Sequence, residues 1–175
     1  GLVLDGKLYA GAHWAGGELG HTVICMDGEP CNCGRRGCWE AYSAAPALIR
    51  QTQRAMQAHP ESKLWQAAPQ LSQVSGKTVF QAVAMGDEAA RAVLDFYVKA
   101  LAVGLSNVVN SLDPDVLCLG GGVSGAGEAL MRPLRAEMAG QSYARPGQET
   151  TKLVLAQLGN DAGLVGAAML YRQHR

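Results

Sequence analysis

The chain has 175 residues, of which 48% are hydrophobic and 17% are charged. These values are typical of a globular protein with a hydrophobic core rather than of a disordered chain. The formal net charge is zero and no run of Lys or Arg occurs, so we expect no nucleic-acid partner. No continuous apolar run approaches the roughly 18 residues of a membrane span, so we expect no membrane partner.

The cysteine count indicates a reducing compartment. Five cysteines are an odd number and we recognise no secretory signal, so a framework of disulfides is disfavoured. We therefore expect a cytoplasmic protein with free thiols. The sequence begins with Gly1 and continues at once into apolar residues, a pattern that we interpret as a fragment of a longer protein.

The first 60 residues are predicted to contain a hairpin, a short strand and a helix. In residues 2–10, Asp5-Gly6 separates two apolar segments and suits a two-residue type I′ turn. Residues 21–26 are interpreted as a strand. Ser43 is predicted to cap a helix with one apolar face, ending near residue 60.

The rest of the chain is predicted to alternate helices and strands. Thr78 and Gln81 form a capping-box pattern, and Asp87 is a suitable cap for the longest helix, which Pro114 would end. The other expected elements are a loop or short helices at 60–77, a buried strand at 116–119, a helix at 126–139, a strand at 153–156 and a helix from 160 or 161 to about 171. This alternation predicts an α/β or α+β class in which helices cover a central sheet.

One glycine-rich stretch has the pattern of a metal site. Cys31, Cys33 and Cys38 have the spacing C-x-C-x4-C, and His21 precedes them. Three thiolates and one imidazole are a complete tetrahedral set for zinc, and a closed set of four is typical of a structural ion. The odd count argues against a disulfide, and the alternative of a core thiol suits Cys118 better than three cysteines in a polar loop.

A second motif follows the strand predicted at 116–119. Gly120, Gly121 and Gly122 begin the pattern G-x-G-x-x-G, which ends at Gly125 and precedes a predicted helix. Amides at a helix N-terminus, beside glycines that allow close approach, suit the phosphates of a nucleotide. The alternative is a tight strand-to-helix turn with no ligand, and the residues alone leave both open.

Two carboxylates flank the predicted metal site. Glu18 and Glu40 can accept paired hydrogen bonds from the neighbouring hydroxyls of a sugar, and the second ring nitrogen of His21 can donate to a hydroxyl. The alternatives are a solvated turn for Glu18 and a favourable charge near a helix start for Glu40. These three residues are candidates for sugar binding.

The sequence resembles the ROK family (repressor, open reading frame, kinase). The resemblance runs from residue 1 to about residue 171. The segments that carry it are Ala15–His21, Cys31–Glu40, Leu119–Val123 and Leu158–Gly163. Within the family, two further segments are most similar to bacterial glucokinases, namely Gly20–Ile24 and Arg36–Tyr42.

The resemblance implies an actin-like, ribonuclease-H-like lobe, with a central mixed sheet flanked by helices and a zinc-bearing loop. It implies sugar binding by Glu18, His21 and Glu40, zinc binding by His21, Cys31, Cys33 and Cys38, and nucleotide contact by Gly120, Gly121 and Gly122. The implied reaction is phosphoryl transfer from ATP, with magnesium, to the 6-hydroxyl of glucose or a related hexose.

The family's phosphate loop and catalytic aspartate have no counterpart in these residues. We therefore interpret residues 1–175 as the C-terminal sugar- and nucleotide-binding lobe of a two-lobed kinase, with no catalytic residue and no activity of its own. One alternative is the sugar-sensing half of a ROK transcriptional repressor, and another is a non-catalytic zinc-stabilised interaction module. We also expect a homo-oligomer, because family members are often dimers and a separate lobe exposes apolar surface.

Overall fold

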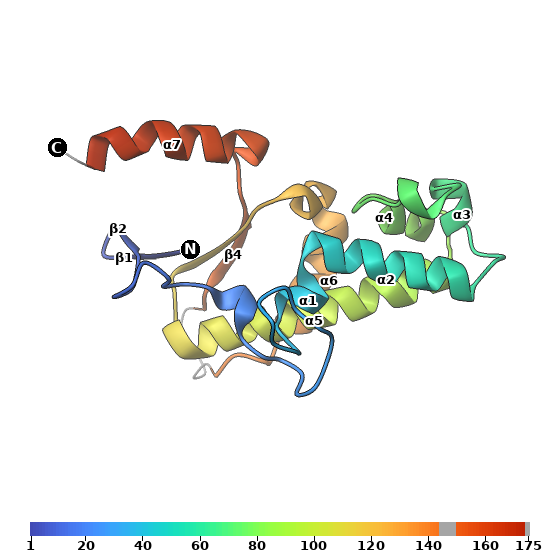
Figure 1. Cartoon of the computed structure of the whole chain (residues 1–175), viewed down its shortest axis with the longest axis horizontal. Helices are drawn as coiled ribbons and strands as arrows, with labels where there is room; N and C mark the ends of the chain where they lie inside the picture. The colour runs from blue at the N-terminus through green and yellow to red at the C-terminus, as the bar shows by residue number, and fades with distance from the viewer. Residues whose placement is uncertain (144–149, 174–175) are drawn as a thin grey trace.

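The computed structural model describes residues 1–143 and 150–173 (Figure 1). The described strands are β1 (Leu2–Leu4), β2 (Lys7–Tyr9), β3 (Val116–Leu119) and β4 (Lys152–Leu155). The α-helices are α1 (Glu40–Ser43), α2 (Ala45–Ala58), α3 (Leu64–Ala67), α4 (Thr78–Ala84), α5 (Glu88–Leu112), α6 (Glu128–Met138) and α7 (Ala162–Gln173). Short 3-10 turns occur at η1 (Leu19–His21), η2 (Leu71–Gln73), η3 (Gly122–Ala126) and η4 (Gly159–Asp161).

The N-terminal hairpin has the predicted turn. Leu4 pairs with Lys7 across a two-residue loop. Asp5 and Gly6 in that loop have φ angles of 51° and 74°, and both are positive as a type I′ turn requires. Large apolar side chains of β1 and β2 remain exposed, so this hairpin adds little to the hydrophobic core.

The core forms around α5. This 25-residue helix buries Leu94, Leu101 and Leu105, and α2, α4 and α6 pack against it. By length and composition alone, α5 is apolar enough to cross a membrane, but 67% of its apolar window is buried inside the protein. Since most of its apolar side chains pack against neighbouring helices, α5 is the core helix of a globular fold.

Asp87 caps α5 as predicted. Its carboxylate accepts hydrogen bonds from the backbone N–H of Ala90 at 2.7 Å, the backbone N–H of Lys63 at 2.7 Å and the Ser62 hydroxyl at 3.0 Å. The helix ends where Asp113 adopts a left-handed conformation directly before Pro114. One carboxylate thus joins the start of the core helix to the segment before α3.

Strands β3 and β4 form a parallel pair joined through η3 and α6. Leu117 and Leu153 on one face pack against the core, whereas Val116 and Cys118 on the other face are exposed. The prediction of a buried strand is therefore wrong for that face, which no described residue covers. The run of four apolar residues does not reveal this, because it reads the same with one face covered or both.

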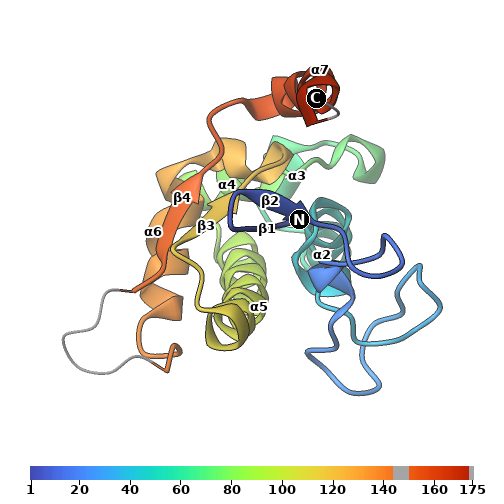
Figure 2. The same ribbon diagram turned by 90° about the vertical axis from the view of Figure 1, so that its left-hand side faces the viewer.

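The mixed α/β class is confirmed, but the predicted single central sheet is not what the described residues form. They build two separate two-stranded sheets, one antiparallel (β1–β2) and one parallel (β3–β4). Figure 2 shows β3 and β4 next to α6, and Figure 1 shows α7 set apart from the helices around α5. Neither sheet buries both faces, because β1 and β2 expose large apolar side chains and β3 exposes Val116 and Cys118.

Three local predictions are also corrected. Residues 21–26 form no strand, and only an isolated bridge joins Val23 to Cys38. Ser43 does not cap α2, because it ends α1 and its hydroxyl donates to the Trp39 carbonyl at 3.0 Å. The predicted capping box does not form, because the Thr78 hydroxyl accepts from the Ser75 N–H at 3.0 Å and α4 has no side-chain cap.

Candidate functional site

The cysteine loop is folded by its own backbone. The Cys31 N–H donates to the Arg35 carbonyl at 2.9 Å, and the Gly37 N–H donates to the Glu29 carbonyl at 2.8 Å. Gly37 has a φ of 76°, and a Cβ at this position would overlap the carbonyl oxygen of Cys25. Only glycine fits this close approach, which directs the following residue, Cys38, inward.

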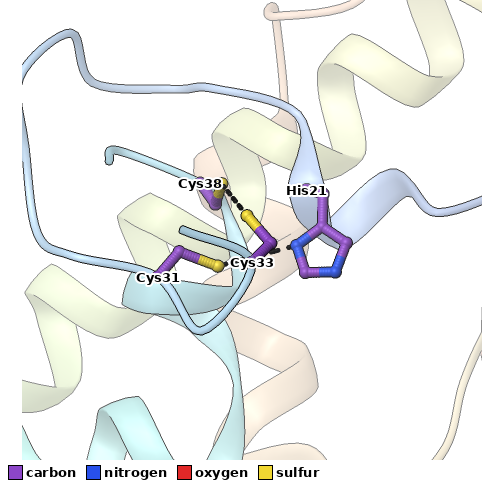
Figure 3. Close-up of side chains that lie close together, drawn as sticks. All are labelled: His21, Cys31, Cys33 and Cys38. Carbon is purple, nitrogen blue, oxygen red and sulfur yellow. Dashed lines mark hydrogen bonds between the residues drawn. The ribbon is translucent and has the colours of Figure 1, made fainter. Parts of the chain in front are cut away.

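The loop brings together all four predicted metal ligands. One donor atom from each of His21, Cys31, Cys33 and Cys38 lies within 4.8 Å of every other (Figure 3). The Cys31 Sγ lies 3.6 Å from the His21 Nδ1, and the Cys33 Sγ lies 3.6 Å from the Cys38 Sγ. The four residues are separated by up to 17 positions in sequence, so their convergence is a property of the fold.

The cluster has the chemistry and size that a metal ion requires. In a tetrahedral zinc site with bonds of about 2.0–2.3 Å, neighbouring donor atoms lie about 3.3–3.8 Å apart. The two 3.6 Å separations fall in this range, and the widest limit of 4.8 Å needs a closure of about 1 Å. The residues present therefore fit a four-coordinate ion with sulfur and nitrogen ligands, a donor set that suits zinc.

The cluster thiols influence one another's pKa values. The backbone N–H of Cys33 lowers the pKa of Cys31, but the Glu40 carboxylate, desolvation and the neighbouring thiols outweigh it and raise that pKa to about 12. The pKa of Cys33 is lowered, mainly by the backbone N–H of Arg35. Three thiolates beside a carboxylate repel one another, so full deprotonation of the cluster requires a cation among the sulfurs.

Glu40 lies beside the cluster, of which His21 is a member, whereas the Glu18 side chain makes no hydrogen bond with it. The Glu40 Oε1 lies 3.7 Å from the His21 Nδ1 and accepts a hydrogen bond from the Cys31 thiol at 3.1 Å. The His21 Nδ1 faces the sulfurs, which leaves the Nε2 available for another partner. The Glu18 side chain is exposed and makes no hydrogen bond with a described residue, although its carbonyl accepts from the His21 N–H at 3.1 Å.

The glycine turn lines a separate hollow of about 200 Å³. Its lining includes Gly120, Gly121 and Gly122, together with Ser43 at the end of α1, Ala44 directly before α2 and Tyr97 of α5. Helix α2 has no side-chain cap, and because Pro46 carries no N–H, the amides without that partner at its start are those of Ala45 and Ala47. Glycines and helix amides facing one hollow suit an anionic group.

The parallel strands direct a second turn toward the same edge. The Ala156 N–H donates to the Leu119 carbonyl at 2.8 Å, which aligns the carboxyl ends of β3 and β4. Turns η3 and η4 follow these ends and contact each other. Ligands of open parallel sheets bind outside the carboxyl ends of the strands, so this edge is the expected place for a nucleotide.

Sequence reasoning missed the contact that attaches the loop to the core. The Trp39 indole N–H donates to the Ala100 carbonyl of α5 at 2.9 Å, and the Tyr42 hydroxyl accepts from the Glu29 N–H at 2.6 Å. A signal was present, since Trp39 and Tyr42 are large aromatic residues directly after a polar loop. Such residues mark the point where an irregular segment meets a core.

The ROK family pattern matches residues 1–174. A glucokinase of Halalkalibacterium halodurans is 35% identical over 99% of this chain and 52% of its own length. A Streptomyces griseus ROK family glucokinase, solved with glucose and AMPPNP, has a TM-score of 0.87 and 32% identity over 97% of this chain and 55% of its own. A xylose repressor of Bacillus spizizenii is 26% identical over 99% of this chain and 41% of its own length.

The fold, the Cys/His cluster and these similarities define the class of protein. The chain belongs to the ROK family, and it is glucokinase-like in that glucokinases match it at higher identity than the repressor does. The chain spans about half the length of the curated relatives it matches.

Proposed function

We propose that residues 1–175 are the sugar- and nucleotide-binding lobe of a cytoplasmic, ATP-dependent kinase that phosphorylates glucose at its 6-hydroxyl. The observation that carries this proposal is the position of the Glu40 carboxylate next to the His21 imidazole of the metal-type cluster. The similarity to a glucokinase solved with glucose and AMPPNP supports the choice of substrate class. The catalytic base would lie in the other half of the whole protein.

His21, Cys31, Cys33 and Cys38 would hold a zinc ion. When bound, zinc would stabilise the loop and keep three thiols deprotonated, and a closed set of four ligands leaves no position for water activation. A deprotonated Cys31 can no longer donate to Glu40, so this carboxylate becomes free to accept hydrogen bonds from a ligand. The His21 Nε2–H can then donate to a neighbouring sugar hydroxyl.

Glu18 and Glu40 would orient the sugar by accepting hydrogen bonds from adjacent hydroxyls. The backbone amides of Gly120–Gly122 and the start of α2 would bind the nucleotide phosphates, whose charge magnesium would partly neutralise. In the transfer step, the 6-hydroxyl oxygen forms a bond to the γ-phosphorus as the bond to ADP breaks. The hydroxyl proton goes to the base in the other half. The contribution of this lobe is positioning.

The test is a coupled ADP-release assay on the whole protein with glucose, mannose, N-acetylmannosamine and xylose. We expect turnover to be highest with glucose, and Glu40→Gln to raise the glucose KM by about tenfold or more. Glu61→Gln is a matched control, because this exposed glutamate lies in the segment between α2 and α3, outside the candidate site. No phosphorylation of any sugar by the wild-type protein would contradict the proposal.

The second candidate is a sugar-sensing half of a repressor, which the similarity to a xylose repressor favours. It predicts that the whole protein binds a sugar without consuming ATP and carries a DNA-binding head outside these residues. Calorimetry with glucose and xylose, in the absence and presence of ATP, separates the two candidates. Sugar binding without turnover selects the repressor.

A further inference from the structure

Trp39 connects the cysteine loop to the core helix α5. It stands in sequence between Cys38, a cluster residue, and Glu40, a proposed sugar ligand. Its indole Nε1–H donates to the Ala100 carbonyl of α5 at 2.9 Å, and its backbone N–H donates to the Thr22 carbonyl at 2.8 Å. A shift of this one residue would therefore move both neighbours and the segment that follows η1.

The indole reaches α5 because position 104 has no side chain. Gly104 follows Ala100 by one helical turn, so both residues lie on the same face. A Cβ on Gly104 would overlap three atoms of the Trp39 ring, Cε2, Cδ2 and Nε1. Alanine is the better helix former at an interior position, so helix stability alone does not explain this glycine. The close approach of the ring does.

Resting on the proposed function, we propose that Gly104 is a positioning residue for sugar binding. By admitting the Trp39 indole against α5, it fixes where Glu40 lies relative to the core helix. The same helix carries Tyr97 and Leu101, which line the hollow at the glycine turn. Gly104 thus sets the position of α1, which carries the Glu40 carboxylate, against the helix that also lines the proposed nucleotide site.

The test compares Gly104→Ala with wild type in the whole protein. We expect the glucose KM to rise by about tenfold, because a small displacement of Glu40 weakens its hydrogen bonds to the sugar. The ATP KM and kcat should change by less than about twofold, because the residues that serve them are not displaced. Gly166→Ala is the matched control: it makes the same change inside helix α7, where a Cβ would meet nothing within 4 Å. We expect this control to leave all three constants unchanged.

A double-mutant cycle with Trp39→Leu tests the mechanism. The smaller side chain leaves room for a Cβ at position 104, so adding Gly104→Ala to Trp39→Leu should change the glucose KM by less than about twofold. An equal effect of Gly104→Ala in both backgrounds, or an unchanged KM in the single variant, would overturn the inference. Wild-type turnover on glucose in the same assay keeps this result separate from a failure of the proposed function.

Trp39→Phe covers the case in which Gly104→Ala does not fold. It removes the indole N–H donor and adds no atoms to the contact. We expect a rise of the glucose KM by about threefold or more at nearly constant kcat. A glucose KM equal to that of the wild type would also overturn the proposal.

Discussion

The cysteine loop and the helices around α5 are held in place by different forces. No residue from 21 to 36 is buried, whereas the helices bury large side chains completely, among them Leu48, Leu64 and Leu134. Apolar burial therefore stabilises the helices, while the loop depends on backbone hydrogen bonds, two aromatic anchors and the four side chains of the cluster. An irregular segment that buries little apolar surface needs such cross-links to keep one conformation.

Loss of one cluster thiol should have the largest effect. We expect it to disorder the cysteine loop and to leave the helices folded. We expect Cys33→Ser to lose the bound metal and to disorder the loop, because a structural ion contributes directly to folding free energy. The far-UV circular dichroism of the helices should change little. Metal analysis and thermal melting measure the two effects. Cys118→Ser is the control, since this exposed thiol lies in β3 outside the cluster; full metal content in Cys33→Ser would reject the ligand set.

A cavity in the helical core should destabilise the helices and leave the metal site intact. We expect Leu48→Ala to lower the free energy of unfolding by about 2–5 kcal/mol, because its side chain is fully buried against the core. Metal content at low temperature should stay unchanged. Denaturant unfolding measures the loss, with Leu112→Ala as a control at a side chain that is 43% exposed. Metal release from Leu48→Ala under folded conditions would show that the two regions are not separate.

The Asp87 cap should make the stability of the helices depend on pH in the acid range. Burial alone would raise the pKa of Asp87, but the N–H groups of Ala90 and Lys63 and the Ser62 hydroxyl hold it below its usual value. The lowered pKa means that the stabilisation is complete above the ordinary pKa of about 4 and is lost as the pH falls through the lower folded pKa.

For this cap we expect Asp87→Ala to cost about 2–3 kcal/mol at neutral pH. Asp87→Asn should keep part of the cap and flatten the acid limb of the stability profile. Urea unfolding between pH 2 and pH 7, values chosen to span both pKa limits, measures both effects. Asp95→Asn, at an exposed position of α5, is the control. An unchanged acid limb in Asp87→Asn would contradict the assignment.

The ion pair between the loop and α2 should have the smallest effect. Arg54 contacts Glu29 through two hydrogen bonds of 2.6 Å and 3.1 Å, but the Arg54 side chain is 57% exposed. We expect Arg54→Ala to cost at most about 1 kcal/mol, and less in high salt. Thermal melting at low and high salt tests this. A larger loss that persists in high salt would mean that the pair organises the loop.

The sequence predicts best what local chemistry determines. The Asp5-Gly6 turn, the Asp87 cap and the grouping of His21 with three cysteines each follow from residue types at fixed spacing, and all are confirmed. The predicted strand at 21–26 is wrong because those residues are folded by bonds to the other side of the loop. The roles of the sugar-binding and glycine-turn residues, and the homo-oligomer, remain predictions.

Contacts between distant segments are what the sequence does not reveal. Trp39 and Gly104 are unremarkable separately, one an aromatic residue after a cysteine and the other a glycine within a long helix. Only their contact explains both. The two small sheets escape prediction for a similar reason, since strand pairing depends on which segments the fold brings together.

Helix α5 also fixes the distance between the loop contact and the hollow at the glycine turn. The loop contacts this helix at Gly104, and Leu101 lines the hollow at the glycine turn. The two residues are three positions apart in the helix, which corresponds to a rise of about 4.5 Å along its axis. A helix cannot stretch or shorten by small steps, so it keeps this spacing through any rigid movement. Insertion or deletion of a single residue between 101 and 104 would rotate one contact by about 100° relative to the other.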